Sequence, residues 1–244
     1  MSDFALKLSL YSILISASVF SGSLIPLTIS WAKKQLPLLL AFSAGIMLGA
    51  TLMHLLPEAY ELMGRMAPFW VLAGFLFLYT FEKFVTVHIC EALDCEVHTV
   101  GVTAVLGLSV HSLADGIALG SGLLVPQLGF VVFLTIFFHK LPEAFALTSI
   151  LMHEGYRRSK ILLLNLLLIV MVPVGALMVQ GFAHSSGISF TGIALAFSAG
   201  TFLHISLSDL LPEVHKYETR RNSIFAGFLL GLILMFLLYR FLQA

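Results

Sequence analysis

Long runs of apolar residues, separated by short polar stretches, form the main pattern along the chain. A transmembrane helix needs about 20 mostly apolar residues. Eight segments meet this requirement, over approximately 8–30, 37–56, 69–87, 100–123, 128–152, 161–182, 189–211 and 224–242. The runs are continuous and lack the polar stripe of an amphipathic helix, which favours helices within a bilayer. The pattern therefore predicts an all-α integral membrane protein with eight transmembrane helices.

Composition supports this fold class. Hydrophobic residues make up 59% of the chain and charged residues 11%, against roughly 45–50% and about 25% in soluble domains. The eight segments fill most of the 244 residues, so we expect one transmembrane domain over 1–244 and no soluble domain. The formal net charge is +0, which favours no nucleic-acid partner. The first segment is too long for a signal peptide and has no basic stretch before it, so we interpret it as a retained helix.

Two segments of the chain resemble each other. AFSAGIMLGATLMHLLPE (Ala41–Glu58) aligns without gaps on AFSAGTFLHISLSDLLPE (Ala196–Glu213), with 11 of 18 positions identical and an offset of 155 residues. They lie in the second and seventh predicted helices, which cross the membrane in opposite directions. Inverted repeats are typical of secondary transporters, with the substrate site between the repeats. We therefore predict a 3+2+3 arrangement, with helices 1–3 over about 8–87, helices 4–5 over about 100–152 and helices 6–8 over about 161–242.

Basic residues are unevenly distributed between the two sides of the predicted bundle. Three lie on the side of the termini, and one, Lys140, lies within the membrane. Nine lie on the opposite side: Lys33, Lys34, Lys83, Arg157, Arg158, Lys160, Lys216, Arg220 and Arg221. By the positive-inside rule the nine are cytoplasmic, so both termini are expected outside. We expect a multi-pass protein of the plasma membrane or of a bacterial inner membrane.

Histidines and acids recur in the two central helices. HSLADGIAL (His111–Leu119) and HKLPEAFAL (His139–Leu147) each carry an acid four residues after the histidine. Residues four apart lie on one face of a helix, so His111 aligns with Asp115, and His139 with Glu143. Two antiparallel neighbouring helices could bring these side chains to one point. Nitrogen and oxygen ligands without thiolate suit a divalent transition metal.

Charged groups at this depth are costly, which argues for a function. On insertion scales an ionised side chain at a helix centre costs about 2.5–3.5 kcal/mol, so Asp115, Lys140 and Glu143 together cost about 7–10 kcal/mol. An interhelical hydrogen-bond cluster is the alternative to a metal site. The same four-residue spacing in both helices favours the metal site.

Proline and glycine lie close to these acids. Pro142 cannot donate a hydrogen bond to the carbonyl of Phe138, which leaves a free acceptor one residue before His139. Gly116 and Gly120 are expected to loosen the turn after Asp115. Both features suit a site that must open.

The motifs HSLADGIALG and HKLPEAFAL, flanked by the inverted AFSAG…LLPE segments, resemble the Zrt- and Irt-like (ZIP) metal transporters over nearly the whole chain. The resemblance implies movement of Zn²⁺ or a similar divalent cation into the cytoplasm. It also implies a primary metal site at His111, Asp115, His139 and Glu143, with Met47 as a thioether ligand. The metal is a substrate, and no organic cofactor is expected.

The chain departs from the family pattern at a second metal site that some members hold. The corresponding positions are Ser112, Lys140 and a glutamate before the proline of helix 6, which here is Val172. A protonated ammonium cannot ligate a metal. We therefore hypothesise a mononuclear site in which Lys140 takes the place of the second cation and balances the two acids.

Other polar residues are candidates for a route on either side of the main site. In the predicted topology His54 lies towards the outside, and His204 and Asp209 lie towards the cytoplasm. Asp209 occupies the repeat position of His54. These three are the pathway candidates.

The segment HICEALDCEVH, over 88–98, is expected to be a cytoplasmic loop. It contains His88, Cys90, Cys95 and His98, and it resembles the metal-rich loop of many ZIP proteins. The spacing differs from that of a standard zinc finger. Metal capture and a merely solvated acidic loop are the two interpretations.

Two other classes of protein remain as alternatives. An intramembrane metal-dependent hydrolase would use such ligands to activate water, but the chain has no HExxH motif and no evident nucleophile; we expect that it is not an enzyme. A structural bundle or channel subunit does not explain four converging ligands. The ligand set does not separate Zn²⁺ from Fe²⁺, Mn²⁺ or Cd²⁺. Small residues permit close helix packing, within one chain or across a homodimer: Ala44, Gly45, Ala199 and Gly200.

Overall fold

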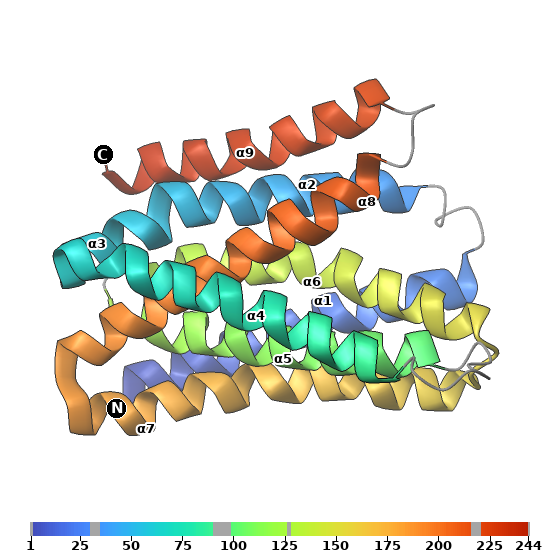
Figure 1. The fold of residues 1–244 in the computed structure, drawn as a ribbon, viewed down its shortest axis with the longest axis horizontal. Coiled ribbons are helices and arrows are strands. Elements are labelled where there is room, and N and C mark those ends of the chain that lie inside the picture. Colours follow the sequence, from blue (N-terminus) through green and yellow to red (C-terminus); the bar gives the residue numbers. More distant parts are fainter. Residues whose placement is uncertain (1, 30–34, 90–98, 126–127, 216–220, 244) are drawn as a thin grey trace.

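A computed structural model describes residues 2–29, 35–89, 99–125, 128–215 and 221–243. The described residues form helices and no strands (Figure 1). The elements are α1 (Ser2–Thr28), α2 (Leu36–Ala50), η2 (Thr51–Leu55), α3 (Leu56–Met63), η3 (Gly64–Met66), α4 (Ala67–Ile89), α5 (Thr99–Leu123), α6 (Leu128–His153), α7 (Arg158–His204), η4 (Ile205–Leu210), α8 (Leu211–His215) and α9 (Arg221–Gln243).

Seven stretches of the described chain are long and apolar enough to cross a membrane. This finding confirms the all-α membrane protein. The second stretch, Leu36–Phe84, has 49 residues, about twice what one pass needs. Within it the backbone of Gly64 has φ 56°, a conformation that favours glycine, and α4 runs back in the opposite direction from α2 and α3 (Figure 1). The chain has eight passes if this stretch is counted as two, and seven if it is counted as one. The eight-pass count therefore stays a prediction.

The predicted sixth helix and most of the predicted seventh fall within one helical element, α7. Two candidate spans lie in and beyond it, Arg158–Gly181 and Phe190–Leu210, and the ribbon doubles back between them (Figure 1). The first helix begins earlier than expected, at Ser2 instead of about residue 8. Asp3 lies in its first turn, and its carboxylate is 2.8 Å from the ammonium of Lys7 four residues later, which favours helix at this end.

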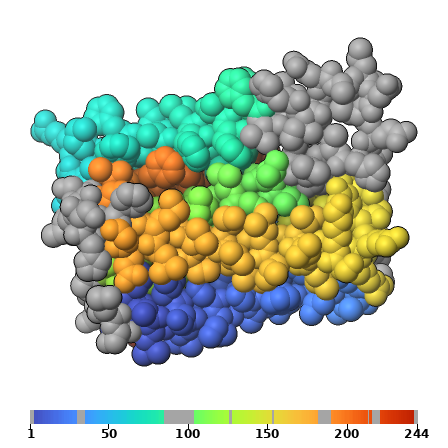
Figure 2. Space-filling view, turned by 90° about the horizontal axis from the view of Figure 1, so that it is seen from below, coloured from blue at the N-terminus to red at the C-terminus, as the bar shows by residue number. Residues whose placement is uncertain are grey.

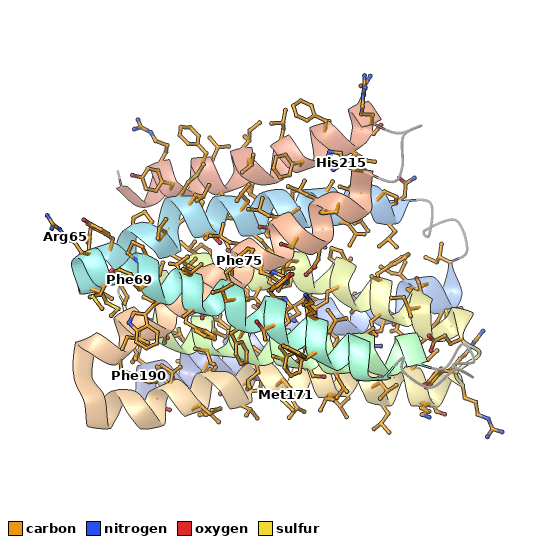
Figure 3. The ribbon with its side chains drawn as sticks, viewed as in Figure 1. Arg65, Phe69, Phe75, Met171, Phe190 and His215 are labelled. Carbon is orange, nitrogen blue, oxygen red and sulfur yellow. The ribbon has the colours of Figure 1, made fainter. Side chains whose placement is uncertain are left out.

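The start of α1 and the end of α9 lie at the same end of the bundle (Figure 1). Arg65 lies at that end and His215 at the opposite one (Figure 3). The most apolar part of α5 and of α6 is 61% buried, against 33% in α1 and 22% in α9. Figure 2 shows one outer face, where the first part of α7 lies between α1 and α5. The two helices with the polar motifs are therefore more buried than α1 and α9.

Glycines allow pairs of helices to meet backbone to backbone. A Cβ on Gly45 of α2 would meet the carbonyl oxygen of Phe228 in α9, and one on Gly231 of α9 would meet that of Phe42 in α2. The pair α4 and α7 repeats this reciprocal contact, at Gly74 and Gly200. Gly45 and Gly200 are equivalent positions of the sequence repeat. These small residues therefore pack against helices of the same chain.

Gly116 of α5 serves the same purpose. A Cβ there would meet the carbonyl oxygen of Val172 in α7, and one on Gly175 would meet that of Leu113 in α5. Gly120 packs against Ala176. The sequence analysis expected Gly116 and Gly120 to loosen the helix, whereas the structure uses them for close contact between α5 and α7.

Two short π-helical turns interrupt the repeat segments at equivalent places. In η2 the N–H of Leu56 donates to the carbonyl of Thr51, and in η4 the N–H of Leu211 donates to the carbonyl of Ser206. Each bond spans five residues, and the two pairs are offset by 155 residues, as in the sequence repeat. Such turns are rare and often occur at functional sites.

Replacing Gly200 by alanine is expected to destabilise the protein, because the added Cβ meets the backbone carbonyl of Val71. Overpacking of this kind costs about 1–3 kcal/mol, and the midpoint of thermal unfolding in detergent should fall by about 2–4 °C per kcal/mol. Gly107→Ala is the control, since a Cβ there has nothing within 4 Å. Equal midpoints for Gly200→Ala and the unmodified chain would contradict the close crossing.

Candidate metal site

The polar motifs of α5 and α6 face each other in the interior. His111 and Asp115 lie on α5, and His139, Lys140 and Glu143 lie on α6. Each is at most 9% exposed, and Lys140 and Asp115 are 0% exposed. The four-residue spacing places each histidine and its acid on the side of the helix that faces the other helix.

The four predicted ligands converge. The Nε2 atom of His111 lies 3.4 Å from Oδ2 of Asp115 and 3.5 Å from Oε2 of Glu143. The Nε2 atom of His139 lies 3.3 Å and 3.9 Å from the same two oxygens. All four ligand atoms lie within 4.8 Å of one another. Two ligands about 2.1 Å from a tetrahedral zinc ion are about 3.4 Å apart, so this spacing fits a metal ion after small shifts.

A backbone hydrogen bond sets the tautomer of His139. Its Nδ1–H donates to the carbonyl oxygen of Thr135, at 2.8 Å. In the neutral ring the lone pair is then on Nε2, which faces the carboxylate of Asp115 at 3.3 Å. Two lone pairs that face each other are satisfied by a cation between them, and this is the usual arrangement of a histidine that binds a metal.

Lys140 neutralises part of the acidic charge. Its Nζ lies 2.8 Å from Oδ2 of Asp115 and 2.7 Å from Oε2 of Glu143, and it donates to the Oγ atom of Ser112 at 2.8 Å. It also donates to Oε1 of Glu143 at 2.8 Å, so the three protons of the ammonium group are shared among four oxygens. With both histidines neutral, the cluster keeps one negative charge, which attracts a further cation.

Two buried atoms of the cluster have no hydrogen-bond partner among the described residues. They are Nδ1 of His111 and Oδ1 of Asp115. A buried polar atom of this kind normally finds a partner, and unsatisfied ones are concentrated at functional sites. Oδ1 of Asp115 is therefore free to bind a ligand, while Oδ2, the oxygen that faces both histidines, is also bonded by Lys140.

A cavity of about 130 Å³ opens beside the cluster. His111, His139 and Glu143 line it together with Met47 of α2. Met47 is 1% exposed, and it lines the same cavity as three of the four predicted ligands. Pro142 also lines the cavity, within the continuous helix α6.

The pathway candidates are separated by the structure. The Nε2 atom of His204 lies 3.9 Å from Oδ2 of Asp209 and 2.8 Å from Oε2 of Glu82 in α4. His54 lies elsewhere, with Nε2 3.3 Å from the carbonyl oxygen of Met235 and its ring against that of Tyr239. The sequence analysis missed Glu82. The only signal in the sequence was that Glu82 is an acid near the end of an apolar run. It has no partner at a repeated spacing, unlike the acids that follow His111 and His139 by four residues.

Cys90, Cys95 and His98 lie outside the described residues, and so does the side chain of His88.

Comparison with known proteins places this geometry in a family. A family model described as ZIP Zinc transporter matches residues 4–93 and 91–239, nearly the whole chain. The chain belongs to the ZIP zinc transporter family. It is 30% identical to zinc transporter ZIP9-A of Xenopus laevis, over 88% of this chain and 86% of the relative. It is 28% identical to ZIP9 of Micropogonias undulatus with the same coverage, and 26% identical to zinc transporter 3 of Arabidopsis thaliana, over 81% and 72%.

ZIP membership confirms the family predicted from the motifs and the multi-pass membrane protein. The family consists of zinc transporters and not of enzymes, which supports metal transport and goes against the hydrolase alternative.

Proposed function

We propose that this ZIP protein carries Zn²⁺ or a similar divalent cation across the membrane towards the cytoplasm, through a site between α5 and α6. The ligands proposed are His111, Asp115, His139, Glu143 and Met47. The convergence of four ligand atoms within 4.8 Å, inside a chain surrounded by lipid, is the observation that supports the site most directly. The names of the relatives support zinc as the substrate.

The ligand set is consistent with a borderline cation. Imidazole and thioether suit Zn²⁺, Fe²⁺ and Cd²⁺ better than Mg²⁺ or Ca²⁺, while the carboxylates also accept Mn²⁺. We take Zn²⁺ as the physiological substrate and the other three as competitors. No organic cofactor is proposed.

The proposed topology has eight passes in one transmembrane domain, with α2–α3 and α4 as separate passes. Both termini are outside, because the described ends of α1 and α9 share one end of the bundle (Figure 1), and most basic residues belong to the opposite side. The equivalent π turns and the reciprocal glycine contacts support the inverted 3+2+3 repeat. The plasma membrane or a bacterial inner membrane is the proposed location.

A homodimer stays a prediction. The small residues that raised it, Gly45 and Gly200, contact helices of the same chain.

We propose that the α5–α6 site binds a single ion. The Lys140 ammonium already bonds both carboxylates and the hydroxyl of Ser112. Val172, at the third position of the second site, is 0% exposed and apolar, so it offers no ligand. Lys140 thus acts as a tethered cation where some family members hold a metal.

Uptake of radioactive Zn²⁺ by cells that express the protein tests the function. His139→Ala removes one ligand and is expected to lower the initial uptake rate about tenfold or more. His215→Ala is the control, because His215 is exposed and its Nδ1 bonds the carbonyl of its own helix. Uptake by His139→Ala at the rate of the unmodified chain would refute the proposed site.

Cysteine labelling tests the sidedness. The chain has two cysteines, Cys90 and Cys95, both in the segment predicted to be cytoplasmic. A membrane-impermeant maleimide should label them only after the cells are permeabilised. In a variant with both cysteines replaced by serine, Ser2→Cys should be labelled on intact cells. The reverse pattern would show the opposite orientation.

Lys140→Asp tests the single-ion site, because a carboxylate can ligate the second cation that the ammonium replaces. Anomalous scattering from Cd²⁺-soaked crystals should show one peak between α5 and α6 in the unmodified chain and two in the variant. Lys140→Asn provides an amide oxygen if the aspartate variant is not produced. A single peak in both variants would mean that Lys140 does not occupy a metal position.

A further inference from the structure

We propose that Glu82, His204 and Asp209 form a second divalent-cation site, separate from the α5–α6 cluster and assembled by the π-helical turn η4. The geometry of this site is independent of the proposed transport site. Its role as a stop for an ion that leaves that site does rest on the proposed function.

The three side chains offer one nitrogen and two carboxylate ligands at suitable distances. The Nε2 atom of His204 lies 2.8 Å from Oε2 of Glu82 and 3.9 Å from Oδ2 of Asp209. All three ligand atoms lie within 4.8 Å of one another. A site with three protein ligands leaves a coordination position for water or another ligand. This pattern suits an ion that is bound and then released.

The π turn brings His204 and Asp209 to one face. In an α-helix, at about 100° per residue, two residues five apart point about 140° away from each other. Ile205–Leu210 is π-helical, and the hydrogen bonds of a π-helix join residues five apart instead of four. Residues five apart across this turn therefore lie on the same face of the helix. His204 and Asp209 therefore share one face of the helix only because the π-helical turn η4 lies between them.

The neighbouring rings hold His204 in the required orientation. Its ring meets Phe75 at 5.1 Å and Tyr79 at 6.0 Å between centroids, both edge to face, and both rings come from α4, the helix of Glu82. His204 is 2% exposed, and its Nδ1 is buried without a partner in the described part of the chain. Polar contacts therefore pass through Nε2, the atom that faces both carboxylates.

One cavity connects this triad with the primary cluster. Its walls include His111, His139 and Glu143 from the first site, and Glu82 and Asp209 from the second. The side chain of Asp209 is 41% exposed and that of Glu82 is 32% exposed, whereas the ligands of the first site are almost fully buried. An ion that moves from the first to the second site thus moves from an enclosed position to a more open one.

The other half of the repeat lacks this arrangement, which makes it a matched control. With the offset of 155 residues, His204 and Asp209 correspond to Gly49 and His54. Glu82 corresponds to Tyr239 if it follows the offset of 157 residues that relates Gly74 to Gly231. The equivalent place beside η2 therefore contains a single histidine and no carboxylate. The proposed site belongs to one side of the protein only.

Equilibrium binding of Cd²⁺ to the purified full chain tests the proposal. With both cysteines replaced by serine, to remove the thiols of the 88–98 segment, we expect two ions per chain, and loss of one in each of Glu82→Gln, His204→Ala and Asp209→Asn. His139→Ala should lose the other ion, and His139→Ala combined with His204→Ala should lose both. His54→Ala, which changes the buried histidine of the other π turn, should keep two. Thermal unfolding of each variant without Cd²⁺ shows whether it is folded, and His204→Gln is used if His204→Ala is not.

The outcomes separate this proposal from the proposed function. If His204→Ala and Asp209→Asn still bind as many ions as the unmodified chain, the second site does not exist. If a single ion binds to the unmodified chain and only His139→Ala loses it, the second site is again refuted. A single ion that His204→Ala loses and His139→Ala keeps would support the second site and refute the primary one.

Discussion

One ammonium group, buried between α5 and α6, holds two carboxylates in an interior that contains few other charges. Lys140 bonds Asp115 on one helix and Glu143 on its own, so the apolar surroundings contain one net charge and not two. Loss of one partner from a buried ionic group is strongly destabilising, by about 3–5 kcal/mol. The contact also fixes how α5 and α6 are rotated against each other, because the same rotation must bring His111 and His139 to the two acids. The same relative rotation of α5 and α6 therefore sets both the geometry of the ligands and the pairing of the charges.

Much of the fold and of the central cluster could be predicted from the sequence. Continuous apolar runs are sufficient to predict membrane helices, because a bilayer admits only helices and closed barrels, and the strands of a barrel alternate apolar and polar residues. The spacing of four between His111 and Asp115, and between His139 and Glu143, predicted a shared face, since a helix places such residues together whatever surrounds it. The same reasoning could not predict how the remaining helices are rotated about their own axes. Lipid and protein interior are both apolar, so a hydrophobic pattern does not indicate which face of a membrane helix is buried.

The errors and omissions have physical causes of the same kind. His54 and Asp209 are equivalent in the repeat and face the equivalent helices α9 and α4, but their neighbours differ. His54 meets Tyr239, whereas Asp209 lies near Glu82, because α4 and α9 lie outside the aligned segments. The triad of Glu82, His204 and Asp209 required a π turn, which changes the helical phase by one residue and has no signature in composition. The start of α1 at Ser2, with an ion pair between Asp3 and Lys7 in its first turns, lies before the apolar run from which the helix was predicted.

The reciprocal glycine contacts determine which parts of the bundle can move against each other. Where Gly45 meets α9 and Gly231 meets α2, no side chain lies between the two backbones. Side chains can change rotamer to absorb a displacement, whereas two peptide backbones in contact cannot. Sliding of α2 along α9 would push a side chain into a carbonyl group, so these two helices move together as one rigid unit. The same holds for α4 and the second part of α7. Relative motion is left to the interfaces that contain flexible side chains and the cavity.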